Sequence, residues 1–114
     1  MPRAKRGFKR RRRHNKVLDR AEGFVLGRKN KFKRTAEAVD RAFMYAYRDR
    51  RAKKRDFRAL WIQRINAGAR EHGMSYSELM GKIHAKGLEL NRKSLADLAM
   101  NHPAAFKAVI DQVK

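Results

Sequence analysis

Residues 43–70 read FMYAYRDRRAKKRDFRALWIQRINAGAR, and the character of this stretch changes at its middle. It contains no proline and a single glycine, and most of its residues favour the α-helix. Its first half carries seven cations: Arg48, Arg50, Arg51, Lys53, Lys54, Arg55 and Arg58. Its second half has the apolar spacing of a buried helix face, with Leu60, Trp61, Ile62 and Ile65. The stretch therefore predicts one long helix that joins a cationic surface to a folded core.

The seven cations surround most of this predicted helix, since they spread over roughly 220° of its circumference. The remaining strip holds Asp49, Ala52, Asp56 and Ala59, whose spacing keeps them on one side. Asp49 can pair with Lys53, but most of the cations have no acidic partner in the sequence. Because solvated helix faces usually mix both signs of charge, we favour a surface that binds a polyanion over an ordinary solvated face.

The charge of the chain is concentrated in its first half. The 114 residues include 31 Lys and Arg against 11 Asp and Glu, a formal net charge of +20. Residues 1–58 hold 23 basic and 6 acidic side chains, whereas residues 59–114 hold 8 and 5. Self-repulsion of this size opposes a compact state in the first part when it is alone. We therefore predict two domains: a basic extension, residues 1–58, and a small helical globular domain, residues 59–114.

The N-terminal arm, residues 1–16, is the most basic segment. Pro2 and Gly7 discourage regular structure there, so we expect the arm to be disordered in isolation and to fold where phosphates screen its charges. A nuclear-localisation patch is the competing interpretation. A short helix is predicted from Val17 to Glu22. The candidate binding residues of the arm are Arg3, Lys5, Arg6, Lys9, Arg10, Arg11, Arg12, Arg13, His14 and Lys16.

A second basic segment, RKNKFKR, follows at residues 28–34 and contains one aromatic side chain. Phe32 suits two roles equally well: it can stack on an unpaired base, or it can cover a neighbouring helix. The other candidate binding residues of this segment are Arg28, Lys29, Lys31, Lys33 and Arg34.

The helix signals predict an all-α fold, in which a long basic N-terminal extension (arm plus long helix) leads into a small C-terminal helical globular domain. Thr35 can cap the long helix, which should run to about Glu71. Ser75, Asn91 and Pro103 can each start a shorter helix. The predicted core comprises Trp61, Ile62, Ile65, Leu79, Met80, Ile83, Leu95, Leu98, Ala99, Phe106, Val109, Ile110 and Val113.

Signs of catalysis or of metal binding are missing. The chain has no cysteine, which excludes disulfides, zinc fingers and thiol catalysis. His72, His84 and His102 are scattered, and no paired carboxylates or HExxH motif accompany them. No apolar run approaches the length of a membrane span, and a secretory signal is absent. We expect no enzyme, metal, cofactor, membrane or small-molecule substrate, and a location inside the cell; a mitochondrial presequence is only weakly opposed by Asp19 and Glu22.

The basic segments have the chemistry of nucleic-acid binding. Arginine forks to phosphate oxygens and stacks on bases, and aromatic residues interleave the cations at Phe8, Phe24, Phe32, Tyr45, Tyr47 and Phe57. Cations spread around a helix would overhang the single face that a B-form groove offers, whereas a folded RNA can surround them. A basic leucine zipper would continue in a Leu heptad, which does not follow here. RNA is therefore the favoured partner.

Three segments resemble the bacterial large-subunit ribosomal protein L20 (bL20) family: PRAKRGFKRRRRHNKVL, YAYRDRRAKKRDFRALWIQRINAGAR and GMSYSELM. The resemblance runs essentially end to end. It implies an extension that threads into large-subunit (23S) rRNA, binding early in subunit assembly, neighbouring large-subunit ribosomal proteins as partners, a cytoplasmic location in the ribosome, and neither catalysis nor cofactor. Some members also repress translation of their own mRNA. Two departures are Val25, where many relatives carry an aromatic residue, and Gly68, where alanine is usual.

The resulting hypothesis is a structural, rRNA-binding constituent of the large ribosomal subunit. The alternative is a nucleoid-type protein that binds duplex DNA without sequence preference.

Overall fold

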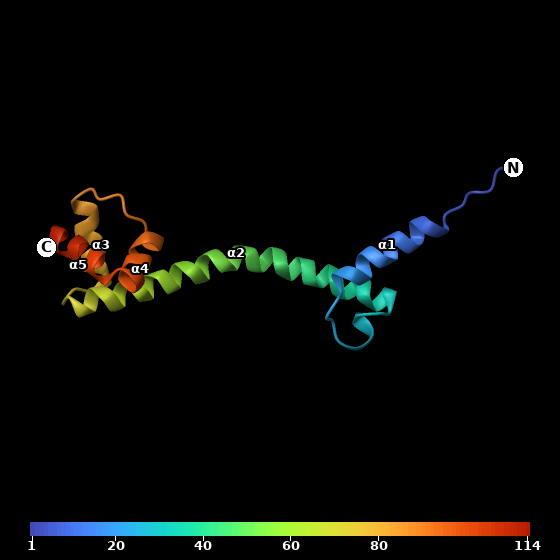
Figure 1. Ribbon diagram of the computed structural model, residues 1–114, viewed down its shortest axis with the longest axis horizontal. Helices are drawn as coiled ribbons and strands as arrows, with labels where there is room; N and C mark the ends of the chain where they lie inside the picture. Colours follow the sequence, from blue (N-terminus) through green and yellow to red (C-terminus); the bar gives the residue numbers. More distant parts are fainter. The chain divides into compact units, whose positions relative to one another are not determined.

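The computed structural model describes residues 1–114, and every regular element in it is helical (Figure 1). It has no strand and no cis peptide bond. The elements in chain order are α1 (Gly7–Arg20), the short 3-10 helix η1 (Leu26–Arg28), α2 (Phe32–Glu71), α3 (Tyr76–Ala85), α4 (Arg92–Asn101) and α5 (Pro103–Val113). The predicted all-α fold, with a long helix followed by a smaller helical region, is confirmed.

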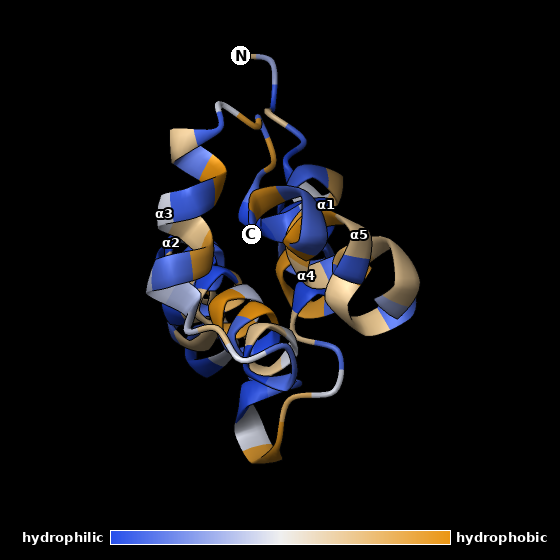
Figure 2. Ribbon diagram, turned by 90° about the vertical axis from the view of Figure 1, so that its left-hand side faces the viewer, coloured by the Kyte–Doolittle hydropathy of each residue, from blue (hydrophilic) through white to orange (hydrophobic).

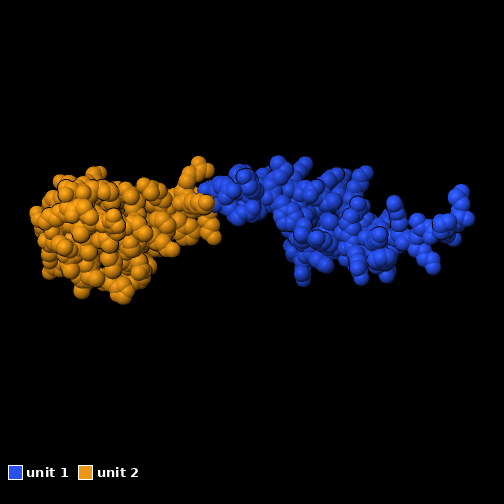
Figure 3. Space-filling view, turned by 90° about the horizontal axis from the view of Figure 1, so that it is seen from above, with its two compact units in different colours: residues 1–51 blue, residues 52–114 orange.

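The chain forms two compact units, residues 1–51 (unit 1) and residues 52–114 (unit 2), shown in different colours in Figure 3. Helix α2 belongs to both, because its 40 residues run through the boundary. The boundary predicted after residue 58 was drawn from charge and concerns which part folds alone, so it stays a prediction.

Unit 2 holds the hydrophobic core of the chain. The last part of α2 supplies Ile65 and Ala69, both fully buried, and α3, α4 and α5 pack against them. Apolar and hydrophilic positions alternate along these helices in Figure 2, as a one-sided core requires. The other core side chains are Met74, Leu79, Met80, Ile83, Leu95, Ala96, Phe106, Ile110 and Val113. Trp61, Leu98, Ala99 and Val109 are only partly buried at its edge. The predicted core is thus confirmed except for Ile62, which is partly buried but does not pack against this cluster.

The three short helices of unit 2 begin where the sequence predicted. The side chain of Ser75 accepts a hydrogen bond from the Glu78 N–H, and the Glu78 carboxylate accepts one from the Ser75 N–H, which completes a capping box for α3. Asn91 caps α4 by accepting from the Ser94 N–H. Pro103 occupies the first turn of α5, where its missing N–H costs nothing.

Gly68 lies on the buried side of α2 and allows α5 to approach closely. A Cβ atom at this position would lie 2.9 Å from Cε1 of Phe106 and 3.3 Å from Cβ of Ala99. The first distance is shorter than any ordinary carbon contact, so the missing side chain makes room for the Phe106 ring.

Unit 1 has much less buried surface, and two helix boundaries in it differ from the prediction. Helix α1 begins at Gly7 rather than at Val17, so most of the basic arm is helical in the structure. Arginine is a good helix former, and repulsion between neighbouring charges costs only a few tenths of a kcal/mol per pair. Whether the arm stays helical therefore depends on its contacts with other segments. Its disorder in isolation stays a prediction for the free protein.

Helix α2 begins at Phe32, so the predicted cap at Thr35 is wrong. The Thr35 N–H already donates to the Lys31 carbonyl oxygen at 2.8 Å, and the Lys31 N–H donates to the Gly27 oxygen, which continues the turn backwards. The Thr35 side chain is fully buried and its hydroxyl has no partner. Thr35 is therefore a buried residue inside α2 and does not cap the helix.

Candidate nucleic-acid interface

The cations predicted to bind are all exposed, and almost none is neutralised by the protein. Only two ion pairs form in the chain: Arg34 with Glu37 at 3.6 Å, and Arg48 with Asp49 at 3.0 Å. The pair expected between Asp49 and Lys53 is not formed, because Asp49 faces Arg48. The remaining lysines and arginines, from a total of 31, have no carboxylate partner and are free to meet an external anion.

Aromatic rings lie beside guanidinium groups in the middle of α2. The Arg48 guanidinium lies 4.8 Å from the ring centre of Tyr45, and that of Arg51 lies 4.8 Å from the ring centre of Tyr47. Both rings are more than half exposed. A flat cation over an exposed ring has two uses for RNA, since the cation meets phosphate while the ring can stack on a base.

Phe32 fulfils the second of its two expected roles in the structure. Its ring stacks on His14 of α1, with ring centres 3.6 Å apart and planes inclined by 11°. Both side chains are half-buried, so together they hold α1 against the start of α2. Direct contact between these two residues and RNA stays a prediction.

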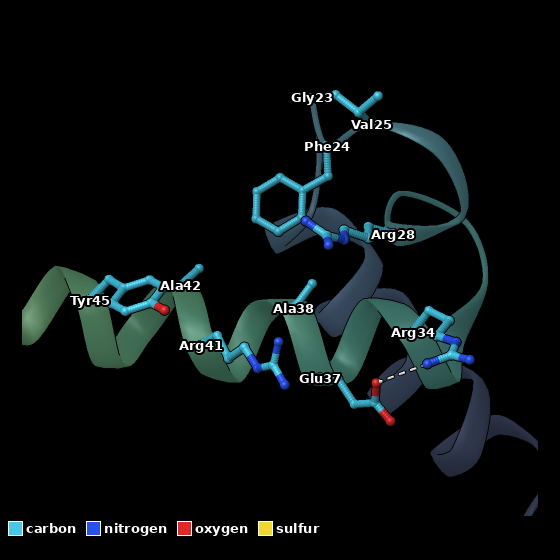
Figure 4. A pocket seen from close by; sticks show the side chains of 10 residues that line it. All are labelled: Gly23, Phe24, Val25, Arg28, Arg34, Glu37, Ala38, Arg41, Ala42 and Tyr45. Atoms are coloured by element: carbon cyan, nitrogen blue, oxygen red, sulfur yellow. Dashed lines mark ion pairs between the residues drawn. The ribbon is translucent and has the colours of Figure 1, made fainter.

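A hollow of about 660 Å³ opens between the loop after α1 and the first part of α2, within unit 1 (Figure 4). In Figure 4, Phe24 points from the loop toward the helix, Arg28 extends toward the Phe24 ring, and Ala38 and Ala42 point from the helix toward the loop. Arg34, Glu37, Arg41 and Tyr45 complete the helix side, and Gly23 and Val25 complete the loop side. The hollow thus combines an aromatic face, a floor of small residues and several guanidinium groups.

Neither this hollow nor two exposed cations of unit 1, Arg41 in its lining and Arg20, is among the sites predicted from the sequence. Arg41 lies seven residues before Arg48 and so shares its side of the helix, a spacing that could have identified it. Arg20, the last residue of α1, lies over the ring of Phe43, 5.1 Å from its centre. The hollow itself depends on how the loop folds over α2, which no local pattern in the sequence indicates.

The structure adds no sign of another chemistry. No group of three or more His, Asp or Glu side chains could hold a metal ion. None of the helices has the length and apolarity needed to cross a bilayer. The one resolved pKa shift belongs to Glu78, whose pKa is lowered by its hydrogen bonds to the backbone and hydroxyl of Ser75. This group caps α3 and lies outside the cationic segments.

Comparison with known proteins identifies the chain. The family described as Ribosomal protein L20 matches residues 3–109. The chain belongs to the ribosomal protein L20 family. Among its relatives, large ribosomal subunit protein bL20 of Flavobacterium johnsoniae is 58% identical over 114 residues, all of both chains. The proteins of the same name from Syntrophotalea carbinolica and Flavobacterium psychrophilum are 58% and 56% identical over the whole chain, covering 97% and 100% of the relative.

Family membership confirms the resemblance inferred from the sequence and gives the chain a structural role in the ribosome. The family is non-enzymatic, in agreement with the prediction that the chain is not an enzyme. Its bacterial relatives are ribosomal components, so the predicted cytoplasmic location in the ribosome is confirmed as well.

Proposed function

We propose that this chain is a structural constituent of the large ribosomal subunit that binds 23S rRNA through unit 1 and the middle of α2. One observation carries the proposal: the cations of these segments are exposed, and apart from Arg34 and Arg48 they lack ion-pair partners. Unpaired charge of this density has to be screened by a polyanion or by solution ions. The relatives' name, large ribosomal subunit protein, indicates which polyanion is present.

The binding mechanism follows from two properties of the cations: their positive charge, which all of them share, and the fixed spacing of those on α2. Each cation that meets a phosphate releases condensed counterions, which supplies affinity that falls steeply with salt. Helix α2 is continuous from Phe32 to Glu71, so the guanidinium groups along it have fixed spacings. Fixed spacings favour an RNA whose phosphates and bases match them. Affinity therefore comes from the charge in both segments, and preference for one RNA comes mainly from α2.

Two further roles are part of the proposal. Binding before most other proteins arrive would neutralise an rRNA junction and let it fold, so the chain would act early in assembly and later contact neighbouring large-subunit proteins. Repression of its own mRNA would need no additional surface, because a message that imitates the rRNA site would meet the same cations. Both roles rest on the family resemblance together with the exposed charge.

The competing function is non-specific binding of duplex DNA, which the same charge would support. Binding to large-subunit rRNA and to duplex DNA of equal length across a salt series separates the two. We expect rRNA to bind more tightly at physiological salt. If duplex DNA binds as tightly, the ribosomal proposal is wrong.

A pair of charge-matched variants makes this test sharper. Replacing Arg50, Arg51 and Arg55 with Ala removes three cations from α2, and replacing Lys93, Lys107 and Lys114 with Ala removes three exposed cations from unit 2. The first variant should flatten the slope of log K against log salt by about two units, because each neutralised phosphate adds about 0.7–0.9 to that slope. It should also reduce the preference for rRNA. The second should change neither slope nor preference; equal effects would point to charge alone.

A further inference from the structure

The hollow between the loop and α2 has the volume of a ligand site. Its volume of about 660 Å³ lies inside the range of roughly 300–1,000 Å³ that is typical of ligand pockets. All of its lining residues belong to unit 1. Ala38 and Ala42 form a flat floor because each ends at Cβ, and the half-buried Phe24 hangs over them from the loop (Figure 4).

The hollow has unpaired positive charge and no unpaired negative charge in its lining, which favours an anionic ligand. The carboxylate of Glu37 is occupied by Arg34 at 3.6 Å. Arg28 and Arg41 form no ion pair, so two guanidinium groups at the edge of the hollow are unneutralised. The flat apolar slot suits a planar ring, and the unpaired arginines at its edge suit a phosphate.

The loop above the hollow is also held in a conformation that its sequence disfavours. Leu26 has φ 58°, in the left-handed region that leucine rarely adopts, and its side chain is 80% exposed. Val25 beside it is 72% exposed and points away from the helix in Figure 4. Two exposed apolar side chains at the tip of a strained loop are a surface that a bound partner would cover.

We propose that this hollow receives a single unstacked nucleotide of an RNA, with its base between Phe24 and the floor of Ala38 and Ala42 and its phosphate against Arg28 and Arg41. This inference rests on the proposed function, because it names the part of the RNA that the site takes. A base inside a duplex cannot enter the slot, since it is stacked and paired. The hollow therefore selects a bulge, a loop or a junction.

Ultraviolet cross-linking of the full chain to full-length large-subunit rRNA tests the proposal, with mass spectrometry to identify the peptide that carries a nucleotide. We expect a nucleotide on Phe24 or Tyr45. Ala42→Leu fills the floor without changing charge and should reduce this cross-link at least ten-fold. Ala59→Leu, an equal change at an exposed position of the same helix in unit 2, should leave it unchanged.

Two more matched pairs measure the affinity that the hollow contributes. Phe24→Ala should weaken rRNA binding about ten-fold, the effect of losing one base stack, whereas Met100→Ala, which removes an exposed apolar side chain of unit 2 that does not line the hollow, should change it less than two-fold. Arg28→Gln should weaken binding more than Lys29→Gln, although each removes one charge. Far-UV circular dichroism checks that each variant remains helical.

The outcomes separate this inference from the proposed function. If wild type prefers rRNA over duplex DNA but Ala42→Leu cross-links and binds like Ala59→Leu, the nucleotide site is wrong and the proposed function stands. If wild type shows no preference for rRNA, the proposed function fails and the nucleotide site fails with it. A cross-link on Phe24 or Tyr45 that Ala42→Leu removes supports both.

Discussion

Gly68→Ala should destabilise unit 2, although the same change usually stabilises a helix. Alanine in a helix interior is better than glycine by roughly 0.5–1 kcal/mol, because glycine loses more conformational freedom on folding. At Gly68, however, the new methyl group would lie 2.9 Å from the Phe106 ring and 3.3 Å from Ala99. Phe106 is 2% exposed and Ala99 is half-buried, so neither can move without disturbing the core.

The sign of the effect follows from these two magnitudes. Forcing one methyl group into a packed core typically costs about 1–3 kcal/mol. Offset by the gain in helix propensity, the net loss of unfolding free energy should be about 1–2 kcal/mol. Removing the obstacle should reverse it: in a Phe106→Leu background the same Gly68→Ala change should cost nothing or stabilise the unit. The coupling free energy between the two positions should therefore reach about 1–3 kcal/mol.

Urea unfolding followed by far-UV circular dichroism measures all four members of this cycle. Gly81→Ala is the matched control, because Gly81 lies inside α3 and an added Cβ would meet nothing within 4 Å. It should stabilise the protein by roughly 0.5–1 kcal/mol. If Gly68→Ala stabilises by as much as Gly81→Ala, the close approach of Phe106 does not limit this position and the reasoning is refuted.

Three other outcomes are expected. Ile65→Ala should cost about 2–5 kcal/mol of unfolding free energy, because Ile65 is fully buried, and Trp61→Ala should cost less, because Trp61 is only partly buried. A larger loss for Trp61→Ala would show that the core is centred on Trp61 instead. The pKa of Glu78 is lowered below its ordinary 4.5 in the folded chain, so the ionised carboxylate stabilises the fold fully above pH 4.5, and this stabilisation is lost as pH falls through the folded pKa. Glu78→Gln keeps the capping box and should remove this part of the fall in Tm at acid pH. Trypsin should cleave the RNA-free chain within residues 1–51 first, since that unit is poorly packed; a protease-resistant full-length chain would contradict the expectation.

The parts of the fold that the sequence predicted are those with local causes. Ser75, Asn91 and Pro103 act on backbone groups within three residues, so their positions were sufficient to place three helix starts. The apolar spacing around Ile65 similarly identified the buried face of α2. The exposed cations were predictable for a related reason, because an unpaired charge cannot be buried without a large cost.

The parts that were missed depend on contacts between segments distant in sequence. In the sequence Gly68 was only a departure from the alanine that is usual there, and nothing near it in the chain indicated that Phe106 of α5 lies against it. Thr35 has the chemistry of a cap, but hydrogen bonds to residues of the preceding loop extend α2 past it. The hollow beside Phe24 requires the loop and α2 together. No pattern within a short window of sequence contains these facts.

The contrast between the two units links folding to binding. Only Ala21, Thr35 and Val39 are buried in unit 1, and the Thr35 hydroxyl is unpartnered, which itself costs stability. A unit that buries so little and carries so much unpaired positive charge gains stability chiefly from whatever neutralises that charge. A substitution in the interior of unit 1 should therefore change the affinity for RNA even though the residue itself does not contact RNA. Val39→Ala should weaken binding, because more of the binding free energy would then be used to order the unit. Ile65→Ala lies in the separately packed unit 2 and should leave RNA affinity nearly unchanged under conditions where that unit stays folded.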